Sequence, residues 1–240
     1  MSCVGRSWFS IFSSIVLVTM VGFEAGALGA AETRSVRDLG AFDSVSLGTN
    51  GVLIITQGDR EALEIEASPR DLPRFLTEVR GGTLHIGRAG AESAFFLRPP
   101  IFRLTLKTLA GLETHSSGRI EAKGLRASVL AIRISSSGNI SIDSLACDSL
   151  DAQIVSSGSL SISGTVERQD IRLSSSGNYF AKDFASRVAR VVVSSSGGAT
   201  LRVSDTLAAT VTSSGDARFY GNPQVSGNVT SSGRLVRLGD

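Results

Sequence analysis

Cysteine and histidine are almost absent from the 240 residues of the sequence, which contains two of each. Cys3 precedes the one long apolar run, so Cys147 is the single thiol of the main body and no internal disulfide can staple it. A lone cysteine of this kind is typical of a small buried side chain. The two histidines, His85 and His115, are too few for a histidine cluster, so no metal site and no catalytic residue is predicted from them.

Lysine is also scarce, with three residues, and the formal net charge is only +2. The arginines are scattered among acidic residues instead of forming a basic run, so no nucleic-acid partner is expected. Serine, by contrast, occurs 37 times, with 27 copies from Ser116 onward. Apolar residues still make up 42% of the chain, which excludes a disordered low-complexity protein. The composition predicts a globular protein built from small residues.

An export signal is predicted over residues 1–31. Arg6 provides a positive charge before the apolar run from Ile11 to Phe23, and the small residues Gly29-Ala30-Ala31 offer a cleavage site. The run is shorter than the ~20 residues that a membrane-spanning helix needs. The sequence therefore predicts export to the periplasm, the cell surface or the medium, with no stable transmembrane segment after cleavage. An uncleaved membrane anchor is the alternative.

The serines belong to a repeat. Ser-Ser-Gly occurs seven times, with successive glycines 20, 20, 19, 20, 18 and 18 residues apart. A period near 20 is too long for a heptad or a collagen triplet. The triplets are Ser116-Ser117-Gly118, Ser136-Ser137-Gly138, Ser156-Ser157-Gly158, Ser175-Ser176-Gly177, Ser195-Ser196-Gly197, Ser213-Ser214-Gly215 and Ser231-Ser232-Gly233.

Apolar and polar residues alternate on both sides of each triplet. Positions at an even offset from the glycine are mostly aliphatic and those at an odd offset are mostly polar, which is the pattern of a half-buried β-strand. The fourth position before the glycine is typical, with Thr114, Ile134, Ile154, Leu173, Val193, Val211 and Val229. Such columns become neighbours if each repeat is one coil and adjacent coils pair in parallel, ~4.8 Å apart.

The sequence therefore predicts an all-β fold, a right-handed parallel β-helix of about seven coils of 18–20 residues. The glycine is expected to form the corner of each coil, because without a Cβ atom it can adopt a positive φ. The serine two residues earlier falls on the inward side, where its hydroxyl can bond backbone groups that the bend leaves unpaired. A left-handed β-helix is the alternative, but it requires an aliphatic residue at every sixth position, which these repeats do not sustain.

The residues before the first triplet have a different pattern. Short strands are expected over 41–47, 52–56, 62–67, 83–86 and 101–106, with turns at 49–51 and 57–59. One or two helical turns are expected between Asp71 and Val79, and a loop from Arg88 to Pro100 carries an exposed Phe95-Phe96 pair. No linker separates the two parts. Residues 32–240 are thus predicted to form one domain, with 32–110 as its opening layers and cap and 111–240 as the coils.

Both parts resemble a known bacterial family. The segments that carry the resemblance are Val45–Ile54, Leu63–Ala67 and Gly82–Ile86 in the front part and the Ser-Ser-Gly-Asn-Ile coil at Ser136–Ile140. They are similar to the family called putative auto-transporter adhesin, head GIN domain, over roughly residues 35–235. The resemblance implies an exported right-handed β-helix, similar in shape to pectin-lyase-like folds, with a role in adhesion and no established catalytic residues.

Catalytic motifs are missing from the sequence. It contains neither Gly-x-Ser-x-Gly nor Ser-x-x-Lys, and a Ser-Ser pair at every corner is what a structural turn requires. His115 occupies an outward column, so an exposed substitution is favoured over a catalytic base. Four acids could meet as a Ca²⁺ or lyase-type site, although solvated turn acids are the favoured interpretation. These acids are Asp143, Asp148, Asp151 and Asp170.

Two functions from different classes remain. The first is an exported, non-catalytic, adhesin-like interaction module that contacts a glycan, an envelope component or a surface protein. Its binding face is predicted at the outward residues Arg133, Arg172, Thr200 and Arg218. The alternative is a polysaccharide-active enzyme on a pectin-lyase-like β-helix, which requires paired carboxylates ~5–10 Å apart. No cofactor is predicted, and the sequence assigns no oligomeric state.

Overall fold

The computed structural model describes residues 33–90 and 99–240, so the predicted export signal and the Phe95-Phe96 pair lie outside the described residues. In these residues the chain forms seventeen strands and one 3-10 helix, η1 (Leu72–Arg74), and no helix is long and apolar enough to cross a membrane. The front strands are β1 (Thr33–Asp38), β2 (Ser44–Leu47), β3 (Val52–Gln57), β4 (Ala62–Ala67), β5 (Phe75–Arg80), β6 (Thr83–Arg88) and β7 (Ile101–Leu106). The remaining strands are β8 (Gly111–Thr114), β9 (Arg119–Lys123), β10 (Arg126–Ile134), β11 (Asn139–Ile154), β12 (Ser159–Leu173), β13 (Asn178–Val193), β14 (Gly198–Val211), β15 (Asp216–Tyr220), β16 (Gln224–Val229) and β17 (Arg234–Gly239).

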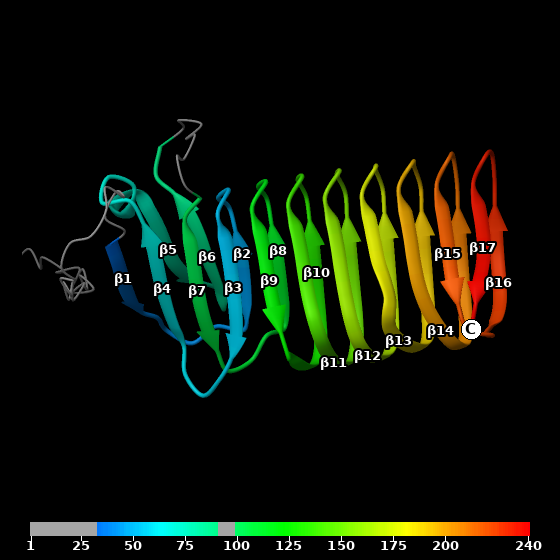
Figure 1. Cartoon of the computed structure of the whole chain (residues 1–240), viewed down its shortest axis with the longest axis horizontal. Coiled ribbons are helices and arrows are strands. Elements are labelled where there is room, and N and C mark those ends of the chain that lie inside the picture. Colours follow the sequence, from blue (N-terminus) through cyan, green and yellow to red (C-terminus); the bar gives the residue numbers. More distant parts are fainter. Residues whose placement is uncertain (1–32, 91–98) are drawn as a thin grey trace, which may run out of the picture.

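The strands stack as coils along one long axis (Figure 1). The segments that lead into the corners form one parallel ladder, the entry sheet, in the order β6, β2, β8, the C-terminal parts of β10 to β14, and β16. The segments that leave the corners form the exit sheet, in the order β7, β3, β9, the N-terminal parts of β11 to β14, β15 and β17. The predicted all-β solenoid of parallel coils is confirmed, and its right-handed sense stays a prediction.

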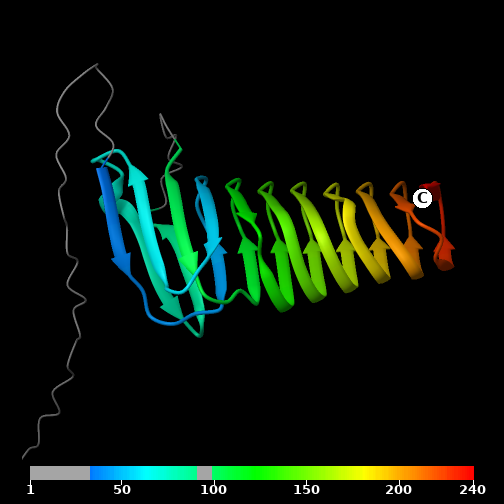
Figure 2. The same cartoon turned by 60° about the horizontal axis from the view of Figure 1, so that its bottom comes forward.

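A third, shorter side closes each coil. We call it the base, and it returns the chain from the exit sheet to the entry sheet. In Figure 1 the base lies along the lower edge of the stack and the corners form narrow loops along the upper edge, an arrangement that Figure 2 shows from another angle. Register shifts between Ile142 and Leu145 and between Ser161 and Gly164 mark the bend into the base. The base comprises residues 125–128, 145–148, 164–167, 184–187 and 202–204.

The alternation along each strand builds the core between the two sheets. Ile132, Ile134, Ile140 and Ile142, all at even offsets from Gly138, are at most 2% exposed. Each pairs with a similarly buried residue on the next coil, so columns of small and aliphatic side chains continue through the stack. Front and coil parts share one buried cluster.

Each Ser-Ser-Gly triplet lies in a bend between the two sheets, but its glycine does not adopt the expected positive φ. That expectation was wrong because the constraint at the corner is space. A Cβ atom on Gly138 would lie 2.6 Å from the carbonyl oxygen of Ser116, and one on Gly197 would lie 2.5 Å from that of Gly177. The carbonyl of Gly177 also accepts a hydrogen bond from the amide of Gly198 at 3.2 Å, so successive corners are joined directly.

Within the coils, the glycines with a positive φ lie instead at the bend into the base, while at the last two corners Ser213 and Ser231 have φ angles of 63° and 60°. Gly124, Gly164 and Gly221 have φ angles of 68°, 119° and 100° at this bend, which favour glycine. At the first corner the inward serine behaves as expected, since the hydroxyl of Ser116 donates to the carbonyl of Thr49 at 2.7 Å. Glycine therefore meets a different requirement on each side of the coil.

The order of the front coils in space differs from their order in the sequence. β2 and β3 form a coil that lies between the β6–β7 coil and the β8–β9 coil. Their connection, Thr49-Asn50-Gly51, takes the place of a Ser-Ser-Gly triplet, because the carbonyl of Gly51 accepts a hydrogen bond from the Arg119 amide at 2.9 Å. The turn predicted at 49–51 is thus a coil corner.

Antiparallel strands close the front end. β4 pairs with β1 and β7 on the exit sheet, and β5 pairs with β6 on the entry sheet. Arg37 of β1 reaches across to β5, where it donates to Oγ1 of Thr77 at 2.6 Å and to the carbonyl of Phe75 at 3.0 Å. The prediction of helical turns between Asp71 and Val79 was wrong beyond η1. The residues that follow η1 form β5 instead, because they pair with β6.

Candidate functional site

A shallow groove of about 1450 Å³ runs along the base. We call it the long groove. Successive coils line it because each contributes its base segment. Its lining residues are Asp43, Thr108–Ala110, Arg126–Val129, Ala146–Asp148, Thr165–Glu167, Ala185–Arg187, Arg202–Ser204, Gly221, Asn222 and Asp240.

Small side chains form the floor of the long groove. Ala146, Thr165 and Ala185 are register partners on three successive coils, and all three are exposed. Arg126 precedes them in the same row and Arg202 follows them. Because parallel strands lie ~4.8 Å apart, the row spans roughly 19 Å. The floor therefore leaves room for an extended ligand between two arginines.

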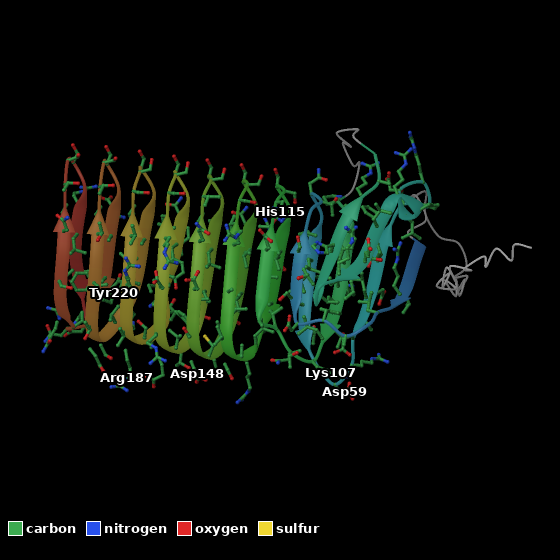
Figure 3. All side chains as sticks on the ribbon, turned by 180° about the vertical axis from the view of Figure 1, so that it is seen from behind. Asp59, Lys107, His115, Asp148, Arg187 and Tyr220 are labelled. Carbon is green, nitrogen blue, oxygen red and sulfur yellow. The ribbon has the colours of Figure 1, made fainter. Side chains whose placement is uncertain are left out.

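Charged side chains form the wall beside this floor. Nε of Arg187 donates to Oδ2 of Asp205 at 2.8 Å, and Nη1 lies 3.3 Å from Oε2 of Glu167. The hydrogen bond to Asp205 raises the pKa of Arg187, while hydrogen bonds from Ser204 and Arg187 lower the pKa of Asp205. Figure 3 shows Arg187 and Asp148 projecting from the lower edge of the stack. Arg187 and Asp205 are thus ionised at neutral pH and hold each other in place.

A smaller hollow of about 410 Å³ lies on the exit sheet. Its most exposed apolar side chain is Phe180 of β13, at 52%. Ser161 and Thr200 are its register partners on the adjacent strands. We call this site the Phe180 hollow, and its lining residues are Ser141, Ile142, Asp143, Ser161, Ile162, Ser163, Phe180, Lys182, Asp183 and Thr200.

The four residues predicted as one outer face lie on two. Arg133 and Arg172 are two coils apart on the entry sheet, whereas Thr200 and Arg218 are register partners on the exit sheet. The split arises because Arg133 and Arg172 precede the corner glycine of their repeats, whereas Thr200 and Arg218 follow it. All three arginines form ion pairs with acids on the same or a neighbouring strand, at 2.8 to 3.8 Å. Thr200 also lines the Phe180 hollow.

The predicted acids do not assemble into a cation site. Asp151 and Asp170 are register partners, but the guanidinium of Arg172 joins them at 2.8 and 2.9 Å. Asp143 and Asp148 lie elsewhere, on the exit sheet and the base. All four stand in strands, so the interpretation as turn acids was wrong: outward strand positions accept charges that pair across coils. Across 33–90 and 99–240, no group of three or more potential metal ligands was found.

The histidines and the thiol lie apart from any catalytic arrangement. His115 is exposed beside the first triplet, with Nε2 3.3 Å from Oε2 of Glu113 and Nδ1 3.0 Å from Oγ of Ser135. Figure 3 places it at a distance from Asp148 and Arg187, toward the corners. His85 is an exposed residue of β6. Cys147 is partly buried under the base, and burial raises its pKa to about 11, so it stays a thiol at neutral pH.

The sequence analysis missed both hollowed surfaces. Phe180 carried a usable signal, because it is the one aromatic residue in the outward column three positions after the glycine. The base segments carried no comparable signal in the sequence. Its segments follow bends of different length, with register shifts, so they do not align when the repeats are superposed on the corner glycine.

Solved structures share this fold at low sequence identity. A putative adhesin from Bacteroides fragilis superposes with a TM-score of 0.79 at 19% identity, covering 88% of this chain and 98% of its own. A putative lipid binding protein from Parabacteroides distasonis gives 0.71 at 22% identity, covering 86% and 96%. A putative adhesin from Parabacteroides merdae gives 0.67 at 19% identity, covering 86% and 96%. These likenesses show the fold.

Family membership follows from the sequence itself. No curated protein matches the chain. Residues 41–223, which include the front coils and six of the seven Ser-Ser-Gly corners, match the family described as putative auto-transporter adhesin, head GIN domain. The resemblance stated from the motifs is confirmed over most of the chain, which belongs to this adhesin head-domain family.

Proposed function

We propose that the protein is an exported, non-catalytic interaction module that holds an extended glycan chain of a cell envelope or cell surface in the long groove. The observation that carries this proposal is the row of small residues Ala146, Thr165 and Ala185 along the base. Each coil repeats a similar surface at the same spacing. A polymer of repeated units therefore gains a contact with every coil that it passes, and weak contacts add up.

The family and two structural neighbours support a surface role, since they are described as adhesins. A third neighbour is described as lipid binding. In this chain the groove is open, and its lining includes the charged side chains of Glu167 and Arg187, with Arg187 also paired to Asp205 next to the groove. An acyl chain binds better in an enclosed apolar cavity, so the groove chemistry favours a hydrated polymer.

Export is part of the proposal. The apolar run from Ile11 to Phe23 and the small residues before Glu32 have the pattern of a cleavable signal. Cleavage there would release residues 32–240 as one domain that carries the whole long groove. The predicted outer-face residues Arg133, Arg172, Thr200 and Arg218 would add contacts on the two sheets.

A polysaccharide-active enzyme is the second candidate, because Asp148 and Glu167 lie side by side in the groove on neighbouring coils. In the structure, however, Oε2 of Glu167 lies 3.3 Å from Nη1 of Arg187, and Glu167 is solvent-exposed, so its carboxylate is engaged in an ion pair. This arrangement supports binding over hydrolysis.

Two measurements test the proposed function together. Cell fractionation with and without residues 1–31 is expected to find the full chain outside the cytoplasm and the truncated chain inside. An array of defined polysaccharides, followed by mass spectrometry of the supernatant, is expected to show binding without shortened products. Retention of the full chain in the cytoplasm would contradict export, and released oligosaccharides would establish the enzyme instead.

A further inference from the structure

We propose that the Phe180 hollow is a second binding site, which takes the ring of an uncharged sugar. It lies on the exit sheet, whereas the long groove lies on the base. The two sites share no lining residue. This inference therefore stands whether or not a polymer binds in the groove.

The phenyl ring of Phe180 is isolated in a polar row. It is the one aromatic ring among the exposed large hydrophobic side chains of the described residues. The hydroxyl residues Ser161 and Thr200 flank it, and Ser141 lies one strand further on. Neighbouring strands are ~4.8 Å apart, so hydroxyl groups stand on both sides of the ring. A ligand that covers the face of such a ring removes apolar surface from water, which favours binding.

Charged groups border the hollow on the side nearest the base. The hydroxyl of Ser163 donates to Oδ1 of Asp143 at 2.8 Å, and this bond helps to lower the pKa of Asp143. Nζ of Lys182 lies 2.8 Å from Oδ2 of Asp183. The rim thus offers carboxylate acceptors and an ammonium donor beside the hydroxyl row.

A sugar ring matches this combination. One face of a pyranose presents C–H groups, which are attracted to the negative face of an aromatic ring. Its edge carries hydroxyls, which donate to carboxylates and exchange hydrogen bonds with serine and threonine. The volume of about 410 Å³ lies near the lower end of the ~300–1,000 Å³ range of small-ligand sites, as expected for one or two sugar units.

The charges of the rim are paired with one another. Nζ of Lys123 lies 3.7 Å from Oδ2 of Asp143, and Nζ of Lys182 lies 2.8 Å from Oδ2 of Asp183, so each carboxylate of the hollow faces an ammonium. A uronic acid would lose hydration of its carboxylate at a rim whose cations are already paired, whereas a neutral hexose has no charge to desolvate. We therefore expect neutral sugars to bind more tightly than the corresponding uronic acids.

The test is an NMR titration of the ¹⁵N-labelled domain, residues 32–240, with methyl glucoside, methyl galactoside, methyl mannoside and methyl glucuronide. At least one neutral glycoside is expected to shift the amide resonances of Phe180, Ser161 and Thr200. Phe180→Leu is expected to weaken that binding about tenfold, because it keeps an apolar side chain but removes the ring. Phe180→Tyr keeps the ring and is expected to bind within a few-fold of the wild type.

Tyr220→Leu provides a matched control. It removes a ring from the same sheet, outside the hollow and stacked on Arg202 with the guanidinium carbon 5.1 Å from the ring centroid. It is expected to leave sugar binding unchanged. The proposal is overturned if none of the three neutral glycosides shifts these amides, if Phe180→Leu binds as well as the wild type, or if methyl glucuronide binds most tightly.

Discussion

The phenol of Tyr179 donates a hydrogen bond to Oε1 of Gln169 at 2.7 Å, inside the core and between two coils. Nε2 of Gln169 donates in turn to Oγ of Ser186 at 2.7 Å, and that hydroxyl donates to the carbonyl of Arg202 at 2.7 Å. Tyr179 is fully buried and Gln169 is only 2% exposed. The chain of bonds satisfies each of these buried groups, so one polar cluster fits into an otherwise apolar stack.

Tyr179→Phe is expected to lower the free energy of unfolding by about 1–3 kcal/mol, because it leaves Oε1 of Gln169 buried without its donor. Urea unfolding followed by circular dichroism measures the effect. Tyr220→Phe is the control, since this partly exposed tyrosine is expected to lose its hydroxyl at little cost. Equal stability of the Tyr179→Phe protein and the wild type would mean that the buried bond is not formed in solution.

Gly197→Ala is expected to destabilise the protein by about 1–3 kcal/mol through overpacking at the corner. The added methyl group would lie 2.5 Å from the carbonyl oxygen of Gly177 and 2.9 Å from that of Ser175, both of which are backbone atoms. Gly87→Ala is the matched control, because no atom lies within 4 Å of its added Cβ. A thermal unfolding scan that ranks the two variants the other way would contradict the close packing of the corners.

Asp216 is expected to make stability depend on pH at the acidic end. Arg234 donates to both of its carboxylate oxygens, at 2.8 and 2.9 Å, and together with Arg218 lowers the pKa of Asp216 below its usual 3.8. A lowered folded-state pKa means that the contribution is present above about pH 3.8 and is lost as the pH falls through the folded value. In thermal scans, Asp216→Asn should therefore melt below the wild type at pH 7, and the gap should shrink below pH 3.8. If the difference in melting temperature between the wild type and Asp216→Asn widened as the pH fell below 3.8, the charged form of Asp216 would not be the stabilising one, and this role would be refuted.

The sequence predicts the coils well because one physical rule covers them. A period of two sets burial along the coil strands from β8 to β15, so even Thr114 occupies the inward column and is buried at 0% exposure. The last coil differs, because it ends the stack and every residue of β16 is exposed. The pairing of the front strands was harder to predict. The strands on either side of Thr49-Asn50-Gly51 would show the same alternation of apolar and polar residues in a hairpin, where they pair with each other, and in a coil, where they pair with neighbouring coils. Only long-range pairing decides that β2 and β3 form a coil between two later ones.

The candidate sites were less predictable than the fold. The sequence analysis explained the corner glycines by a positive φ, and this was wrong. The actual cause is the close approach of the backbones of adjacent coils, which the sequence of a single repeat does not reveal. The long groove arises at the bends into the base, where Gly164 and Leu145 fall after a register shift. Phe180 could have been found, since its column was aligned correctly and only its difference from Ser161 and Thr200 was overlooked.

Binding to the long groove is tested most directly with a substitution that fills its floor. Ala185→Trp places a large ring in the row between Thr165 and Arg202, so a bound chain could no longer pass. Arg190→Ala serves as a control on the same strand, because Arg190 pairs with Asp170 on the entry sheet and lies outside the groove.

The decisive measurement is the dissociation constant of these two variants and the wild type for the polysaccharide that the array identifies. We predict that Ala185→Trp raises it at least about tenfold, a loss of about 1.4 kcal/mol, while Arg190→Ala leaves it within about twofold. Unchanged affinity of the Ala185→Trp protein, with its fold verified by circular dichroism, would contradict the groove as the binding site.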